Sequence, residues 1–120
     1  MKKVLIDTNM LLAAVQFHVD VYDQISAEFY TLESCWQELE KISKKKTRAG
    51  LQARAAMILA KTKNVKKIPA KKENVDEALI VAAKEDNYIV ATNDRELIKA
   101  LKSLNIRVLR LRQKKHLVEE

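Results

Sequence analysis

The stretch VDEALIVAAKEDNYIVATNDRELIKALKSLNIRVLRL, residues 75–111, alternates between two hydrophobic patterns. Its first segment, residues 75–87, carries apolar side chains at helical spacing, and so does its third, residues 95–105. The segments that follow each of these, residues 88–94 and 106–111, are short apolar runs typical of buried strands. Strands that alternate with helices indicate βαβ units and a parallel sheet covered by helices. This stretch therefore predicts an α/β fold.

The rest of the chain carries the same alternation in a weaker form. The predicted strands are residues 3–6, 28–32 and 64–69, and the predicted helices are residues 9–16, 20–28, 34–46 and 51–63. Ser34 is suited to cap the third of these helices, and Gly50 interrupts the pattern before the fourth. We therefore expect a three-layer α/β/α sandwich around a central parallel sheet of four or five strands, formed by a single domain over residues 1–120. The sequence leaves open whether residues 110–120 fray or reach across to a partner molecule.

Composition and charge exclude several classes of protein. A length of 120 residues is enough to bury a core without disulfides, and the single cysteine, Cys35, rules out a disulfide framework and suits a reducing cytoplasm. The charged side chain of Asp7 comes too early for a secretory signal, and no apolar run approaches the length of a membrane span. We therefore expect a cytoplasmic globular protein that has no membrane partner.

The net charge of +7 favours a polyanionic partner such as nucleic acid. A lysine-rich, glycine-poor surface is also typical of thermophile proteins, and composition alone does not separate the two explanations. The basic candidates for RNA contact are Lys44, Lys45, Lys46, Arg48, Lys114 and Lys115. No aromatic residues interleave these stretches, so we expect contacts to the RNA backbone rather than base stacking. As solvated surface, the same residues would need no partner.

Four acidic residues are expected to meet at one edge of the sheet. In an open parallel sheet the carboxyl ends of the strands form one edge, and a crossover helix begins there because it runs antiparallel to its strands. Asp7 ends the first strand, and Asp94 comes directly behind the predicted strand YIVAT. Asp76 lies at the start of one crossover helix, and Glu38 lies in the first turns of another. The sequence therefore predicts an acidic cluster at the carboxyl edge.

Such a cluster needs either a proton or a cation, because carboxylates repel one another. Oxygen ligands suit Mg²⁺ or Mn²⁺, whereas zinc is disfavoured because Cys35, His18 and His116 have no recognisable spacing. A carboxylate-held Mg²⁺ commonly serves in phosphodiester hydrolysis, which agrees with the basic surface. Each acid also has a purely structural explanation. Asp7 would be a turn acceptor and Asp94 an N-cap, while Asp76 would be a charge at a helix N-terminus and Glu38 an exposed partner of lysine. Their shared edge is what favours the metal site.

Four segments together resemble the PIN-domain ribonucleases: LIDTN at residues 5–9, SCWQELEKI at 34–42, VDEALIVAA at 75–83 and YIVATNDREL at 88–97. The resemblance covers essentially the whole chain and implies a parallel sheet flanked by helices, with Mg²⁺ or Mn²⁺ as the cofactor. The acids that it implies as catalytic and metal-binding are Asp7, Glu38, Asp76 and Asp94. It further implies that Asn9 and Thr92 orient these acids or the waters of the metal.

Within the family, residues 88–115 are most similar to the branch that processes small-subunit ribosomal RNA, in its short archaeal form. VapC-type toxins share the acids but often carry an aromatic residue where Leu97 stands, and the processing branch often has a second Asp at the position of Val75. We therefore expect a metal-dependent endoribonuclease, a hydrolase acting on structured RNA such as precursor ribosomal RNA. By resemblance, it leaves a 5′-phosphate and a 3′-hydroxyl.

Other functions stay open at this point. One alternative is a VapC-type toxin ribonuclease, and another is a non-catalytic PIN-like module that binds RNA or protein. An aspartyl-phosphate enzyme of the haloacid dehalogenase type is disfavoured, because Asn9 occupies the position where that class needs a second acid. The resemblance implies a homodimer, and it leaves open whether an antitoxin or a ribosome-assembly protein is the partner.

Overall fold

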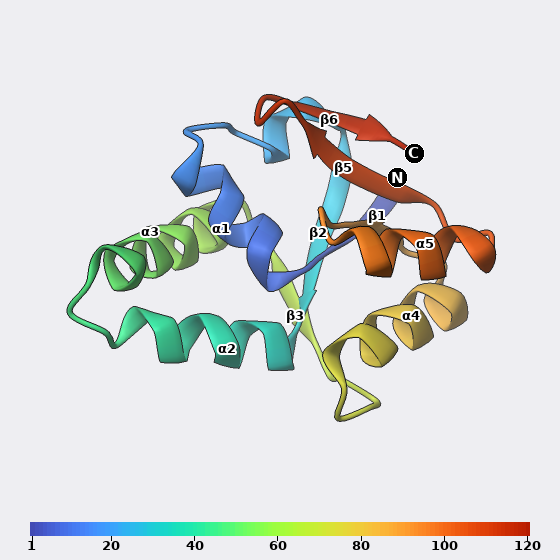
Figure 1. The fold of residues 1–120 in the computed structure, drawn as a ribbon, viewed down its shortest axis with the longest axis horizontal. Helices are drawn as coiled ribbons and strands as arrows, with labels where there is room; N and C mark the ends of the chain where they lie inside the picture. The colour runs from blue at the N-terminus through green and yellow to red at the C-terminus, as the bar shows by residue number, and fades with distance from the viewer.

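The computed structural model describes residues 1–120, which form one sheet with helices on both of its faces (Figure 1). The elements in chain order are β1 (Lys2–Ile6), α1 (Thr8–Gln16), the 3₁₀ helix η1 (Tyr22–Gln24), β2 (Ala27–Leu32), α2 (Glu33–Ser43), α3 (Arg48–Thr62), β3 (Lys66–Ile68), α4 (Val75–Asp86), β4 (Ile89–Ala91), α5 (Arg95–Ser103), β5 (Val108–Arg112) and β6 (His116–Glu119). The strand order is β3-β2-β1-β4-β5-β6, in which β6 runs antiparallel to β5 and the other strands are parallel. No helix in this fold has the length and apolar composition needed to span a bilayer. The predicted α/β/α sandwich is confirmed, but the sheet has six strands, one of them antiparallel, instead of four or five parallel ones.

Strand β1 is buried from both sides, which explains its unbroken apolar run. Val4, Leu5 and Ile6 are each at most 1% exposed. Because successive strand residues point to opposite faces, Val4 and Ile6 pack in a cluster with α1 and α3, whereas Leu5 packs with α4 and α5. Strand β1 therefore ties the two helical layers together.

Strand β1 also lies where the strand order reverses. The chain proceeds from β1 outward to β2 and β3, and then returns to place β4 on the other side of β1. In an open α/β sheet a crevice forms at the carboxyl ends of the two strands at such a point. Asp7 directly follows β1 and Asp94 follows β4, so the topology places both acids beside this crevice.

Residues 20–28 do not form the predicted helix. The carboxylate of Asp20 accepts hydrogen bonds from the backbone N–H groups of Tyr22 and Asp23, at 3.1 and 3.2 Å, and closes a tight turn. Only the short η1 is helical, and the chain then extends into β2. The pairing of β2 with β1 therefore overrides the local helical spacing.

Helices α2 and α3 both begin earlier than predicted. Helix α2 begins at Glu33, so Ser34 lies inside its first turn, where the buried Oγ has no hydrogen-bond partner. Helix α3 begins at Arg48 and is capped by Thr47, whose Oγ1 accepts a hydrogen bond from the N–H of Gly50 at 3.1 Å. The predictions that Ser34 caps α2 and that Gly50 interrupts the pattern before α3 are therefore wrong.

The C-terminal residues fold back on the sheet as β6. The guanidinium of Arg107 donates two hydrogen bonds to the carboxylate of Glu119, at 3.2 and 2.6 Å. The side-chain amide of Gln24 accepts a hydrogen bond from the N–H of Leu117 at 2.7 Å and donates one to the carbonyl of Lys115 at 2.8 Å. These contacts answer the open question about the end of the chain, since it pairs with its own sheet.

Gly50→Ala should destabilise the protein, although alanine is the better helix former. A Cβ at this position would lie 1.9 Å from the backbone carbonyl oxygen of Lys45, so one of the two chain segments has to move. We expect the free energy of unfolding, measured by urea denaturation, to fall by roughly 1–3 kcal/mol, the usual range for an overpacked site. An unchanged or increased free energy of unfolding would contradict this close packing.

Candidate active site

The carboxyl edge of the sheet holds a small acidic cavity of about 140 Å³. Its lining residues come from the N-terminal parts of α1, α2, α4 and α5, whose ribbons can be followed in Figure 1. Its lining residues are Asp7, Thr8, Asn9, Glu38, Val75, Asp76, Leu79 and Asp94. The structure therefore brings together all four acids singled out in the sequence, together with Asn9, and no lysine or arginine lines the cavity.

Asp7 is the most buried of the four acids, with only 8% of its surface exposed. It is the N-cap of α1, and its Oδ1 accepts a hydrogen bond from the N–H of Met10 at 2.8 Å. Burial raises the pKa of the Asp7 carboxyl to about 6, and the nearby negative charges of Asp94 and Asp76 raise it as well. Hydrogen bonds from Thr92 and Met10 oppose this rise. Asp7 is therefore a carboxylate that lacks a compensating positive charge.

Thr92 connects Asp7 to Asp94 from behind the cavity. Its fully buried Oγ1 donates a hydrogen bond to Oδ2 of Asp7 and accepts one from the backbone N–H of Asp94 at 3.1 Å. Asp94 is in turn the N-cap of α5, where its Oδ1 accepts hydrogen bonds from the N–H groups of Glu96 and Leu97 at 3.0 and 3.2 Å. One threonine hydroxyl thus fixes the relative position of the two strand-end acids.

Asp76 and Glu38 are held less tightly. Asp76 lies in the first turn of α4, but Asn74 caps that helix by accepting a hydrogen bond from the N–H of Glu77 at 3.0 Å. The Asp76 side chain is exposed, and partial burial together with the charge of Asp94 raises the pKa of its carboxyl. Glu38 is an exposed residue of α2 that faces the same cavity. These two side chains are therefore free to change orientation.

The basic residues proposed for RNA contact lie elsewhere. Those of the first group, Lys44, Lys45, Lys46 and Arg48, are found at the connection between α2 and α3. Lys114 and Lys115 lie between β5 and β6, where the ammonium of Lys114 is 5.0 Å from the centroid of the Phe17 ring. None of these basic residues lines the acidic cavity, so any contact that they make with RNA is outside it.

The chemistry of the cavity suits a hard divalent cation. Its charged groups are all carboxylates, the donors that Mg²⁺ and Mn²⁺ prefer, and no cationic side chain among the lining residues neutralises them. As the side chains stand, no three His, Cys, Asp or Glu residues are grouped closely enough to hold a metal ion. The exposed Asp76 and Glu38 would have to turn toward Asp7, which is fixed by its hydrogen bonds. The residues therefore fit a divalent cation in kind and location.

Sequence reasoning missed Thr8, which also lines the cavity. It is buried, and its Oγ1 donates a hydrogen bond of 3.4 Å to the backbone carbonyl of Cys35 in α2. This bond joins the start of α1 to the start of α2. The only signal for Thr8 in the sequence is its place between Asp7 and Asn9.

Comparison with known proteins gives three findings. A family model described as a PIN like domain matches residues 4–114. The chain is 36% identical to Ribonuclease VapC4 of Methanocaldococcus jannaschii, over 97% of this chain and 95% of that protein. A solved structure, described as a domain of a functionally unknown protein from the same organism, matches with a TM-score of 0.65 and 21% sequence identity, over 100% of this chain and 98% of that one. At that identity the structural likeness supports the fold alone.

The metal-free protein should lose stability between about pH 4 and pH 6 because of Asp7. The pKa of its carboxyl is raised from 3.8 to about 6 by folding, so the folded state binds more protons than the unfolded state in this range. The free energy of unfolding therefore falls as pH rises through it, by roughly 3 kcal/mol at about 1.4 kcal/mol per pKa unit.

Asp7→Asn should remove this component, so its advantage over wild type in chemical denaturation with a chelator should develop between about pH 4 and pH 6 and stay constant above pH 6. Glu96→Gln, at an exposed acid outside the cavity, is the control and should follow wild type. Parallel pH profiles for wild type and Asp7→Asn would contradict the assignment.

Thr92→Val should destabilise the protein and strengthen its pH dependence. The substitution removes a hydroxyl that serves both Asp7 and the N–H of Asp94, which leaves the buried Oδ2 of Asp7 and the partly buried N–H of Asp94 without this partner, at a cost of roughly 1–3 kcal/mol for the buried group. It also removes a hydrogen bond that lowers the pKa of Asp7, so the loss of stability on raising the pH should grow.

The matched control for this substitution is Thr31→Val, because Thr31 is equally buried and donates to the carbonyl of Ile6 at 2.8 Å. This variant should lose stability by a similar amount at every pH. If both variants showed the same pH profile, Thr92 would have no special connection to the acids.

Proposed function

Because this chain belongs to the PIN-like domain family, we propose that it is a divalent-metal-dependent endoribonuclease of the VapC type. The observation that carries the proposal is the cavity at the carboxyl edge of the sheet, which four acids and no basic side chain surround. Similarity to Ribonuclease VapC4 over nearly the whole chain favours the toxin-type alternative over ribosomal RNA processing, the function expected from residues 88–115 alone. The processing role finds no support among the matched proteins.

In this proposal Asp7, Asp76 and Asp94 hold Mg²⁺ or Mn²⁺, and Glu38 is a further ligand, directly or through water. When bound, the cation would neutralise charge at the scissile phosphate and lower the pKa of a water molecule. The chain itself keeps Asp7 in place through Thr92 and leaves Asp76 and Glu38 open to the substrate. Hydrolysis breaks the P–O3′ bond, joins the water oxygen to phosphorus, and leaves a 5′-phosphate and a 3′-hydroxyl.

Leu97, which stands where VapC-type toxins often carry an aromatic residue, has a packing role. Leu97 is 2% exposed and packs in the core cluster between α4, α5 and the sheet. A leucine at this position is therefore accounted for by the apolar face of α5. It does not weigh against the VapC type.

The partners in this proposal are RNA as the substrate, an antitoxin protein and a second copy of the chain in a homodimer. They follow from the VapC type and stay predictions. We also propose that residues 1–120 act as one domain, since a single sheet contains strands from both ends of the chain.

Asp7→Asn should abolish cleavage of structured RNA in the presence of Mn²⁺. Loss of a metal ligand should lower the rate by at least about 100-fold, the upper range for groups that only support a ligand. The assay compares wild type, Asp7→Asn and Asp94→Asn with the same RNA, with chelator as the metal-free reference. Because Asp94 also caps α5, thermal unfolding of each variant shows whether it is folded.

The control for this assay is Glu96→Gln, which should cleave as wild type does because Glu96 does not line the cavity. Equal cleavage by wild type and Asp7→Asn would contradict the catalytic role of Asp7, and cleavage by neither protein would leave the non-catalytic binding module. A single preferred cut in precursor ribosomal RNA, with unrelated structured RNAs left intact, would restore the processing role instead of the VapC type.

A further inference from the structure

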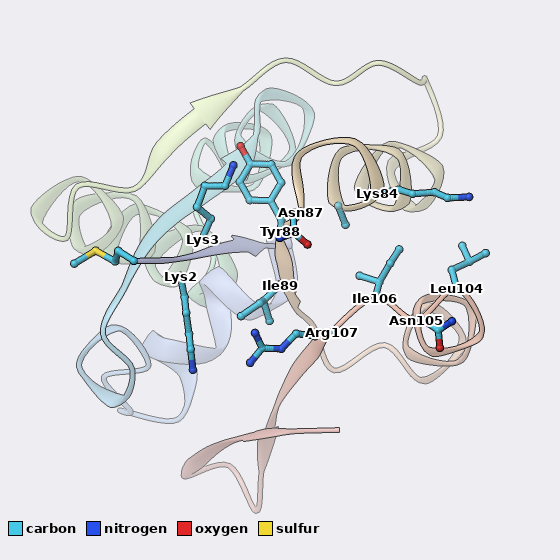
Figure 2. Close-up of a pocket in the computed structure, with 12 residues that line it drawn as sticks. Lys2, Lys3, Lys84, Asn87, Tyr88, Ile89, Leu104, Asn105, Ile106 and Arg107 are labelled. Atoms are coloured by element: carbon cyan, nitrogen blue, oxygen red, sulfur yellow. The ribbon is translucent and has the colours of Figure 1, made fainter.

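The opposite edge of the sheet, where the parallel strands begin, holds a cavity of about 620 Å³. Its charged lining residues are Lys2, Lys3, Lys84 and Arg107, and no acidic residue lines it. Figure 2 shows these side chains around the starts of the strands and the ends of α4 and α5. We call this cavity the basic pocket.

The cations of the basic pocket lie on both faces of the sheet. The strand register places Lys2 and Arg107 on one face, on either side of Ile89 (Figure 2). Lys3 points to the other face, where its ammonium lies 4.5 Å from the ring centroid of Tyr88. The positive charge of the pocket therefore comes from both faces of the sheet and not from one helix.

Most of this charge is not neutralised within the chain. Arg107 is paired with Glu119, whose carboxylate also interacts at longer range with the charge of Lys2, whereas Lys2, Lys3 and Lys84 form no direct ion pair. A lysine near the C-terminal end of a helix is favoured by the helix dipole, which accounts for Lys84 in the last turn of α4. The same explanation does not apply to Lys2 and Lys3, which belong to the start of β1. The helix dipole therefore explains Lys84 but not the positive charges of Lys2 and Lys3.

The acidic cavity cannot hold the phosphates of a long RNA by itself, because no basic side chain lines it. We propose that the basic pocket is a second RNA-binding site, where Lys2, Lys3 and Lys84 hold backbone phosphates of the substrate away from the cleaved bond. This inference rests on the proposed function only in naming RNA as the polyanion. It assigns RNA contact to residues other than those of the α2–α3 connection and the β5–β6 turn.

The pocket recognises the RNA backbone and not its bases. Tyr88, the aromatic lining residue, is 7% exposed, and its ring is already covered by the ammonium of Lys3 and the edge of Tyr30. No aromatic face is left for a base to stack on, so binding depends on charge and varies little with sequence.

The two sites are separated by the length of β1. Its five residues span roughly 17 Å at about 3.3 Å per residue. Phosphates recur about every 3.4 Å along one stacked strand, so a stacked RNA needs about five nucleotides to reach from one site to the other. Short RNAs bound at the acidic cavity should therefore be insensitive to the lysines of the basic pocket.

The test measures RNA binding without cleavage, by fluorescence anisotropy with a labelled 20-nucleotide RNA in chelator. Asp7→Asn is the parent, and Lys2→Gln, Lys3→Gln and Lys84→Gln are added together to make the edge variant. Each phosphate contact contributes about 0.7 to the salt slope for a single strand, so the slope of log K against log[salt] should decrease by about 2. A fourfold rise in salt should then weaken binding by the parent roughly 15- to 20-fold more than binding by the edge variant.

The matched control carries Lys44→Gln, Lys45→Gln and Lys46→Gln, which remove the same charge from the α2–α3 connection. A larger loss of affinity in the edge variant than in this control supports the proposal, and circular dichroism shows that both are folded. Equal losses would mean that only net charge matters, and a larger loss in the control would place the RNA elsewhere; either result overturns the proposal. Unchanged binding by the edge variant overturns it as well, and leaves an acidic protein as the partner to test.

A second measurement separates this inference from the proposed function. With Asp7 intact and Mn²⁺ present, the edge variant should cleave a four-nucleotide RNA at the wild-type rate and the 20-nucleotide RNA more slowly at low RNA concentration. If wild type cleaves neither RNA while the edge lysines still control binding, the nuclease proposal fails and the second site stands. If cleavage of the long RNA is unaffected by the edge lysines, the second site fails and the nuclease stands.

Discussion

Strands β1, β2, β3 and β4 each end at the edge where the next helix begins, and this constraint brings acids from four parts of the chain into one cavity. Asp7 and Asp94 are both N-caps, so the hydrogen bonds that start α1 and α5 also hold these carboxylates in place. The partial positive charge of helix N-termini offsets part of their repulsion. Burial acts in the opposite direction and raises the pKa of Asp7 to about 6. The fold therefore maintains a carboxylate cluster that no basic side chain among the lining residues balances.

The same topology separates charge along the strands. The N-terminal parts of α1, α2, α4 and α5 lie with the acids at the carboxyl edge, whereas the C-terminal ends of α4 and α5 lie at the other edge with Lys2, Lys3 and Lys84. A polyanion is thus attracted to the edge away from the acids, and it is accepted at the acidic cavity only if cations accompany it. The proposed metal requirement for cleavage and the proposed distant basic site for binding both rest on this one arrangement of strands and helices.

Much of this arrangement follows from the sequence, because strand ends and helix starts are visible in it. The helical spacing of residues 75–87 and the apolar run before Asp94 predict α4 and β4, and the parallel topology then places the acids on one edge. The turn at Asp20 was not predicted, because the apolar spacing of residues 20–28 favours a helix. The carboxylate of Asp20 instead accepts two backbone hydrogen bonds that close a turn. The basic pocket was missed for a different reason, since its lining residues come from distant segments and meet only in the folded sheet. A group of residues from distant elements can be predicted from sequence only when the order of strands and helices already places them together. This holds for the acids at the carboxyl edge.

Calorimetric titration of Mn²⁺ into the RNA-free protein shows whether the carboxylates at this edge form one divalent-cation site. We expect saturable binding to wild type that is lost in Asp7→Asn, weakened in Asp76→Asn and unchanged in Glu96→Gln. Binding to wild type should also release protons near pH 6, because the pKa of Asp7 is close to that pH. Equal Mn²⁺ binding by wild type and Asp7→Asn would contradict a shared site, because the acids would then share a cavity without sharing an ion.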